Sequence, residues 1–297
     1  MALAYTTRDY VVQIVAGLGS GAVLFLIASG LTLIFGALRV VNFAHGSLYA
    51  IGAYLAVSLG DQIGFGNFTF WLVLLLSGLL VAASGAFLEV VFFRPIYRRP
   101  LLTQLLVTFA FVLIVAGIIR SVWGAQGEST RTPAFLAGGV RLLDTQVPKY
   151  QFFLMAFAVA VAAVLWAILY KTGLGRMIRA AVSDPELLGL SGVNVRWLFT
   201  GVFALGSFFA GVAGCLVTLQ GAIGPELGVG AIIRAFVVIV IGGLGSLTGA
   251  FIAAFLVGVA EALGILWVPQ ASLAIVFAVL VAVLAVRPQG LLGTRPE

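Results

Sequence analysis

The chain has 297 residues, of which 62% are hydrophobic and only 9% are charged, and its mean hydropathy is +1.21. Soluble domains carry roughly 25% charged residues, so this chain lacks the polar side chains needed to cover a soluble fold of its size. The formal net charge is +6, and the lysine and arginine residues form no basic cluster outside the loops. This argues against nucleic-acid binding and is consistent with basic loops beside anionic membrane lipid. The composition predicts an all-α, polytopic transmembrane helical bundle.

Stretches without charged residues recur along the chain, and each is about long enough to cross a hydrocarbon core of roughly 30 Å. No polar block between them is large enough for a second domain, so we expect residues 1–297 to form one transmembrane domain. The first stretch is too long for a signal peptide and has no basic segment before it, so we expect it to be retained as the first span. The stretches are 10–38, 40–60, 62–88, 100–119, 150–170, 197–225, 235–260 and 262–286.

The sequence VNFAHGSLY holds an amide and the only histidine of the chain, between two apolar stretches. We expect Asn42 to cap a helix that has His45 in its first turn and Phe43 as an apolar wall. Gly46 would allow a neighbouring helix to approach closely, and the helix after Gly245 is the candidate. This predicts a discontinuous helix whose start faces a translocation path. An ordinary span, in which His45 bonds a backbone carbonyl, explains the residues equally well.

Two carboxylates interrupt apolar surroundings. Glu89 lies about one turn before Arg94 and is expected either to snorkel or to pair there, whereas Glu261 is more isolated. Intramembrane carboxylates can form proton relays, so a self-sufficient secondary transporter stays open as an alternative, although structural roles are favoured. No arginine in the predicted spans is placed to hold a substrate carboxylate.

Lysine and arginine residues near the span ends predict the orientation in the membrane. They place the loops around 94–99 and 171–196, together with the tail, in the cytoplasm, and the loop 120–149 outside. The cytoplasmic set is Arg94, Arg98, Arg99, Lys171, Arg176, Arg179, Arg196, Arg287 and Arg295, against Arg120, Arg131, Arg141 and Lys149.

The predicted cytoplasmic segment of about 171–196 contains a short helix. Asp184 is a good N-cap, Pro185 suits the first helical position, and Ser191 and Gly192 can end the helix. A cytoplasmic loop would not normally expose three leucines, so they indicate a partner surface, with packing on the bundle itself as the alternative. These leucines are Leu187, Leu188 and Leu190.

The number of membrane crossings near the end of the chain depends on where its last apolar stretches divide. An even number of crossings must connect Arg196 to a cytoplasmic tail, yet hydropathy gives three stretches. Splitting the region at the sequence GGLGSLTGA gives short segments near 235–248, 250–267 and 271–286, for about eight or nine membrane segments in total. Short glycine-interrupted helices line cavities in transporters. The predicted path or gate therefore also includes Gly242, Gly243, Gly245 and Ser246.

Signatures of catalysis are missing from the sequence. It has no Walker A loop, no HExxH, no nucleophile elbow and no metal-ligand cluster, and its single cysteine, Cys215, excludes an internal disulfide. We therefore expect no catalytic or metal site, and a chain that cannot hydrolyse ATP alone.

Three segments, in the right order, resemble the permease subunits of bacterial branched-chain amino acid ABC importers, the LivH type. They are GLTLIFGALRVVNFAHGSLYAIGAYLA, GLGRMIRAAVSDPELLGLSGVNV and VIVIGGLGSLTGAFIAAFLVGVAE. The resemblance covers nearly the whole chain. It implies a multi-pass inner-membrane permease that moves branched-chain or related amino acids into the cytoplasm, with urea, amides or aromatic acids as alternative substrates.

The resemblance also implies partners. They are a second homologous permease in a heterodimer, two ATPase subunits that bind ATP and Mg, and a periplasmic substrate-binding protein, with no cofactor in this chain. The segment 171–196 would couple to the ATPases. The coupling residues implied are Arg176, Arg179, Asp184, Leu187, Leu188, Leu190 and Gly192.

Overall fold

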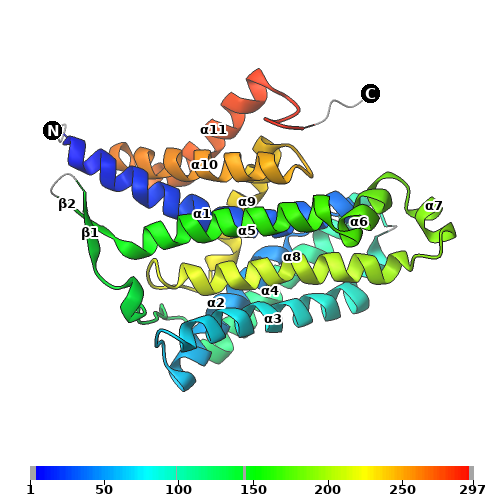
Figure 1. Ribbon diagram of the computed structural model, residues 1–297, viewed down its shortest axis with the longest axis horizontal. Helices are drawn as coiled ribbons and strands as arrows, with labels where there is room; N and C mark the ends of the chain where they lie inside the picture. The colour runs from blue at the N-terminus through cyan, green and yellow to red at the C-terminus, as the bar shows by residue number, and fades with distance from the viewer. Residues whose placement is uncertain (1–4, 98, 143–144, 294–297) are drawn as a thin grey trace.

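The chain forms a helical bundle, shown in Figure 1. The computed structural model describes residues 5–97, 99–142 and 145–293, and this part contains eleven α-helices and one two-stranded antiparallel ribbon. Seven helical segments of the described part are long and apolar enough to cross a membrane, which confirms the predicted fold class. The α-helices are α1 (Thr7–Leu38), α2 (Ala44–Ile63), α3 (Thr69–Leu88), α4 (Leu101–Trp123), α5 (Lys149–Lys171), α6 (Gly173–Ser183), α7 (Pro185–Leu190), α8 (Val195–Val217), α9 (Leu227–Gly242), α10 (Leu247–Trp267) and α11 (Ser272–Val286). The strands are β1 (Gly139–Leu142) and β2 (Thr145–Pro148), and the short turns are η1 (Glu89–Phe93), η2 (Arg94–Ile96), η3 (Ala134–Leu136) and η4 (Pro269–Ala271).

Helix α1 is the core of the bundle. Every residue from 21 to 34 is buried, against α8, α10, α5 and α9. Lipid supplies no hydrophobic drive between membrane helices, so small residues that let backbones approach decide which helices meet. A Cβ on Gly17 would lie 2.8 Å from the carbonyl oxygen of Gly258, and one on Gly21 2.9 Å from that of Ala254. Gly17 and Gly21 therefore allow α1 to pack closely on α10.

The two ends of the bundle carry different loops. In Figure 1, α6 and α7 lie at the end opposite the β1–β2 ribbon. The Arg39 guanidinium donates to the Val182 carbonyl at 3.3 Å, which joins the end of α1 to α6. The backbone of Leu291 bonds Ile241, so the tail lies beside the end of α9. The segment 171–196 and the ribbon of the loop 120–149 thus lie at opposite ends, as predicted, while Arg98 and Arg295 lie outside the described residues.

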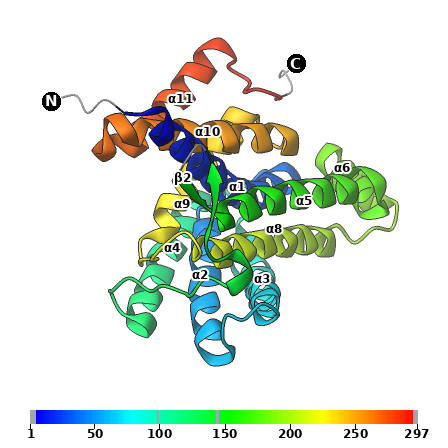
Figure 2. The same ribbon diagram turned by 60° about the vertical axis from the view of Figure 1, so that its left-hand side comes forward.

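The predicted break in the last third of the chain is also present. Helices α9 and α10 are separated at residues 243–246, so α8, α9, α10 and α11 together give the even number of passes that the tail requires. Helix α9 begins at Leu227, earlier than the predicted 235, and its 16 residues reach only about 24 Å at 1.5 Å per residue. Figure 2 shows that α2 runs across the direction of α5 and α8. The bundle thus combines long spans with the short helix α9 and with α2, which crosses the direction of its neighbours.

Candidate functional site

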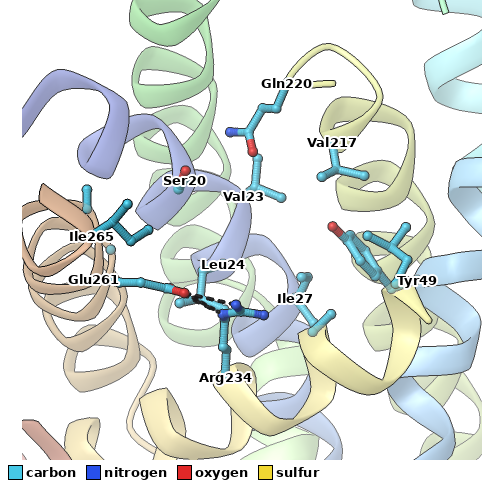
Figure 3. A pocket seen from close by; sticks show the side chains of 14 residues that line it. Ser20, Val23, Leu24, Ile27, Tyr49, Val217, Gln220, Arg234, Glu261 and Ile265 are labelled. Carbon is cyan, nitrogen blue, oxygen red and sulfur yellow. Dashed lines mark hydrogen bonds and ion pairs between the residues drawn. The ribbon is translucent and has the colours of Figure 1, made fainter. Parts of the chain in front are cut away.

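A cavity of about 290 Å³ lies near the middle of α1, among α1, α2, α9, α10 and the end of α8 (Figure 3). Positions 20, 23, 24 and 27 of α1 share one helical face, and so do positions 258, 261, 262 and 265 of α10. The wall is mostly apolar. The lining residues are Ser20, Val23, Leu24, Ile27, Tyr49, Val217, Gln220, Leu227, Ala231, Arg234, Gly258, Glu261, Ala262 and Ile265.

An ion pair between Arg234 of α9 and Glu261 of α10 lies in this cavity. The Arg234 Nε donates to both carboxylate oxygens, at 3.0 and 3.1 Å, and Nη2 donates to Oε1 at 2.9 Å. Nη1 donates to the Gly230 carbonyl at 3.2 Å. The two side chains are 32% and 15% exposed, so the pair is fixed by the protein yet open to the cavity.

The ion pair corrects one expectation drawn from the sequence. Glu261 is not isolated, because Arg234 holds it from the neighbouring helix. The arginine of this pair lies inside α9, between apolar residues. In the sequence Arg234 lies at the edge of an uncharged apolar stretch, which hides its place inside a helix that extends on both sides of it. The feature of the sequence that indicates a helical position for Arg234 is its place as a single charge inside the apolar run VGAIIRAFVVIV.

Two more polar groups of the cavity have no hydrogen-bond partner within the described residues. They are the hydroxyl of Tyr49, a residue that is only 3% exposed, and the amide nitrogen of Gln220. Figure 3 shows both directed toward the space above the ion pair. Unpaired polar groups in an apolar environment are costly, so groups of this kind favour a polar occupant.

The predicted gate at the start of α2 lies next to the cavity, although none of its four residues lines it. His45 is fully buried, and its Nε2 lies 3.1 Å from the Ile27 carbonyl oxygen of α1. Ile27 is itself part of the cavity wall. Phe43 stacks on Phe236 of α9, with ring centroids 5.8 Å apart. His45 therefore ties the start of α2 to the helix that forms the cavity wall.

Two details predicted for this region are wrong. The side chain of Asn42 does not cap α2, because Phe43 occupies the N-cap position and the helix has no side-chain cap. Asn42 is buried, and both of its side-chain polar atoms lack partners within the described residues. Gly46 does not approach the helix after Gly245. A Cβ on Gly46 would meet the backbone of Gly228 and lie 2.7 Å from the Cβ of Ile232, so its neighbour is α9.

The glycine-rich joint between α9 and α10 is a structural connection at the end of the bundle that carries α6 and α7. Gly243 and Gly245 have φ values of 97° and 83°, a region that suits glycine. A Cβ on Gly242 would lie 2.5 Å from the backbone of α10, and the Ser246 hydroxyl caps that helix by accepting from Gly249 N at 3.1 Å. These four predicted gate residues do not line the cavity.

The segment of α6 and α7 matches its predicted local structure. The Asp184 carboxylate accepts from the backbone of Glu186 at 3.0 Å and of Leu187 at 2.9 Å, and Gly192 follows the helix with φ 84°. Leu187 and Leu190 are 61% and 87% exposed, while Leu188 is half-buried. Leu187 and Leu190 therefore do not pack on the bundle itself, whereas Leu188 is partly covered by it.

The two arginines predicted for this segment differ from each other. Arg176 is exposed on α6. Arg179 instead turns back within the chain, where it donates to the Leu169 carbonyl and lies over the Tyr170 ring at 5.3 Å from its centroid. Arg179 therefore fixes α6 against the last turn of α5.

A second buried carboxylate joins three segments at the same end. Glu89, which is fully buried, receives hydrogen bonds from Arg94 Nη2 and Thr200 Oγ1, both at 2.8 Å, and from the Tyr97 hydroxyl at 3.0 Å. Burial and the adjacent carboxylate raise the pKa of the Tyr97 phenol far above its usual value, so the phenol keeps its proton and donates. The predicted Glu89–Arg94 pair is confirmed, and it links the end of α3 to α8.

Comparisons with known proteins match almost the entire chain. The family described as branched-chain amino acid transport system / permease component matches residues 13–284. The permease protein BraD of a Pseudomonas aeruginosa high-affinity branched-chain amino acid transport system is 31% identical, over 97% of each chain. The corresponding LivH of Escherichia coli is 30% identical, over 96% of each chain.

A further relative is LivM of Escherichia coli, another permease protein of a high-affinity branched-chain amino acid transport system. It is 28% identical over 92% of this chain and 68% of LivM. No solved structure matches the chain significantly.

Proposed function

The chain belongs to the permease-component family of branched-chain amino acid transport systems, and on that premise we propose that it is the membrane permease of an ATP-binding-cassette importer that moves branched-chain amino acids into the cytoplasm. The observation that carries this proposal is the match over residues 13–284, which spans the whole helical bundle. Its location is the inner membrane, which it crosses several times. Its role is transport, without catalysis of its own.

The exposed leucines of α7 support coupling to ATPase subunits. Helix α7 is held in place by the Asp184 cap, yet it presents Leu187 and Leu190 to solvent rather than to the bundle. Rigid display of apolar side chains at the end of a membrane bundle is typical of a docking surface. We infer that two ATPase subunits, which would bind ATP and Mg, serve the transporter and that one of them docks here, with Arg176 directed to acidic groups on it.

The remaining partners are proposed from the relatives. Both LivH and LivM of Escherichia coli are similar to this chain, and this supports pairing with a second, related permease as a heterodimer. A periplasmic binding protein would deliver the substrate at the end opposite α7. Exposed apolar residues run along α3 and α4 and would face lipid or the second permease; examples are Leu75, Leu79, Leu106 and Leu113.

The predicted gate residues enter the proposal in an indirect role. His45 bonds the carbonyl of Ile27, and Phe43 stacks on α9, so a movement of α2 would be transmitted to two walls of the cavity. The glycine joint at 242–246 would let α9 and α10 change their relative angle. We propose that both regions shape the path rather than bind substrate.

The test of the proposed function uses the assembled transporter in lipid vesicles. Replacing Leu187 and Leu188 together by serine should abolish or strongly reduce ATP-driven leucine uptake, by releasing the ATPases or by leaving their hydrolysis uncoupled. Val140→Ser changes an exposed apolar residue of β1 at the other end and is the matched control, which should transport normally. Uptake that proceeds without ATP or ATPase subunits would instead establish a secondary transporter.

A further inference from the structure

The Arg234–Glu261 pair has unused bonding capacity that faces the cavity. A guanidinium has five N–H donors, and the bonds to Glu261 and Gly230 occupy three of them. One N–H on each terminal nitrogen therefore has no partner among the described residues. The Glu261 Oε2 accepts only from Arg234 Nε, so it retains a free acceptor position.

The two charges of this ion pair are complementary to the two charges of a free amino acid. A free amino acid near neutral pH carries an α-carboxylate and an α-ammonium, and the two free N–H groups of Arg234 suit the first while Glu261 suits the second. The pair and the amino acid are each neutral as a whole. Placing them side by side, with opposite charges adjacent, adds no net charge to an apolar site.

The rest of the cavity fits a small amino acid with an apolar side chain. Its volume of about 290 Å³ is just below the roughly 300–1,000 Å³ typical of small-molecule sites, which suits a cargo as small as an amino acid. Apolar side chains from three helices, including Leu24, Ile27 and Ile265, form the wall around the ion pair. The unpaired Tyr49 hydroxyl and Gln220 amide offer further bonds to the backbone groups of the cargo.

We propose that the Arg234–Glu261 pair is a substrate subsite that receives the α-carboxylate and the α-ammonium of an amino acid in transit; this proposal rests on the amino-acid transport proposed above. The ion pair stays intact when cargo binds, so no buried charge is left without a partner. Compounds with only one of the two groups would add an unbalanced charge to the cavity. The subsite therefore discriminates by repelling acids and amines as well as by attracting zwitterions.

The experiment measures protection of a cysteine placed in the cavity wall. Ser20 is exposed and lines the cavity, so Ser20→Cys in a Cys215→Ala background provides a reporter on this chain. The rate of its reaction with a maleimide is measured in the assembled transporter without binding protein, as a shift in mass of this chain. L-leucine should slow the reaction, while 4-methylpentanoate and 3-methylbutylamine, which lack the ammonium and the carboxylate respectively, should not.

Two variants and one control separate binding from mere structural support. Arg234→Gln with Glu261→Gln removes both charges and, because the Gln side chain is shorter than that of Arg and has no forked donor group, also the bidentate contact. It should weaken protection by leucine roughly 10- to 100-fold. Arg234→Lys, which keeps the charge but not the bidentate geometry, should weaken it as well. Arg120→Gln is the matched control, because it neutralises an arginine paired with Glu226 outside the cavity, and protection should be unchanged.

The outcomes distinguish this subsite from the proposed function. Equal protection by all three compounds, no protection in the reporter chain itself, or unchanged protection in the double amide variant would each overturn the subsite. ATP-driven leucine uptake is measured in parallel with the unmodified chain. If uptake is present while protection fails, only the subsite is wrong; if uptake is absent from the intact assembled transporter, the proposed function is wrong.

Discussion

Replacing Glu89 by alanine tests the network that joins α3 to α8. The change removes a fully buried carboxylate and leaves the Arg94 guanidinium, whose side chain is 27% exposed, without its anion. Breaking one side of a buried ion pair costs about 3–5 kcal/mol, and the partial exposure of Arg94 favours the lower end, about 3 kcal/mol. Each kcal/mol lowers the melting temperature of a chain of this size class by roughly 2–4 °C, so we expect a decrease of roughly 6–12 °C.

The chain contains its own reporter for this measurement. Cys215 is its only cysteine and is fully buried in α8, so a dye that fluoresces on reaction with thiols follows the opening of α8 in the chain purified alone in detergent. Glu226→Ala is the matched control, because that glutamate pairs with Arg120 at an exposed position where an ion pair contributes less than about 1 kcal/mol.

Two outcomes would refute the reasoning about Glu89. One is a melting temperature of Glu89→Ala no lower than that of Glu226→Ala. The other concerns the double variant Glu89→Leu with Arg94→Leu, which replaces both charges by apolar groups and should be less destabilised than Glu89→Ala. If the double variant melts at a still lower temperature, the cost does not come from an unpaired guanidinium.

Two further predictions concern orientation and the start of α2. A cysteine at Gly139, in a Cys215→Ala background, should react with an impermeant thiol reagent added outside intact cells, whereas one at Ser183 should not; the opposite pattern would reverse the predicted orientation. Gly46→Leu should abolish uptake because α9 leaves no room for a side chain. His45→Ala should reduce uptake while the transporter still assembles. Gly201→Leu, at a glycine with no close neighbour, is the control for both. Normal uptake by Gly46→Leu would contradict the close crossing of α2 and α9.

Features that depend on neighbouring residues in the chain could be predicted from the sequence. The cap and end of α7 follow from Asp184, Pro185 and Gly192, because a carboxylate before a proline and a glycine after the last turn act within one helical turn. The break between α9 and α10 follows in the same way from clustered glycines. The Glu89–Arg94 pair also lies within a short distance in sequence.

Features that depend on packing between distant helices could not be predicted. Glu261 and Arg234 are 27 residues apart on different helices, and no local pattern indicates that their side chains meet. Charges usually mark the edges of spans, so the sequence places Arg234 at such an edge. Asn42 has the side chain of a good N-cap, yet it is buried against the bundle and the helix begins after it. In each case the tertiary contact outweighed the local preference.

The central position of α1 has a consequence for biogenesis. This helix is synthesised before two of the helices that bury it, because α8 and α10 begin only at Val195 and Leu247. At a synthesis rate of roughly 5–20 residues per second, its final neighbours arrive on the order of 10–50 s later. During that interval the glycine-lined faces of α1 must be occupied by lipid or by the insertion machinery. Nascent chains that stop before α8 should therefore be recognised as unassembled and degraded.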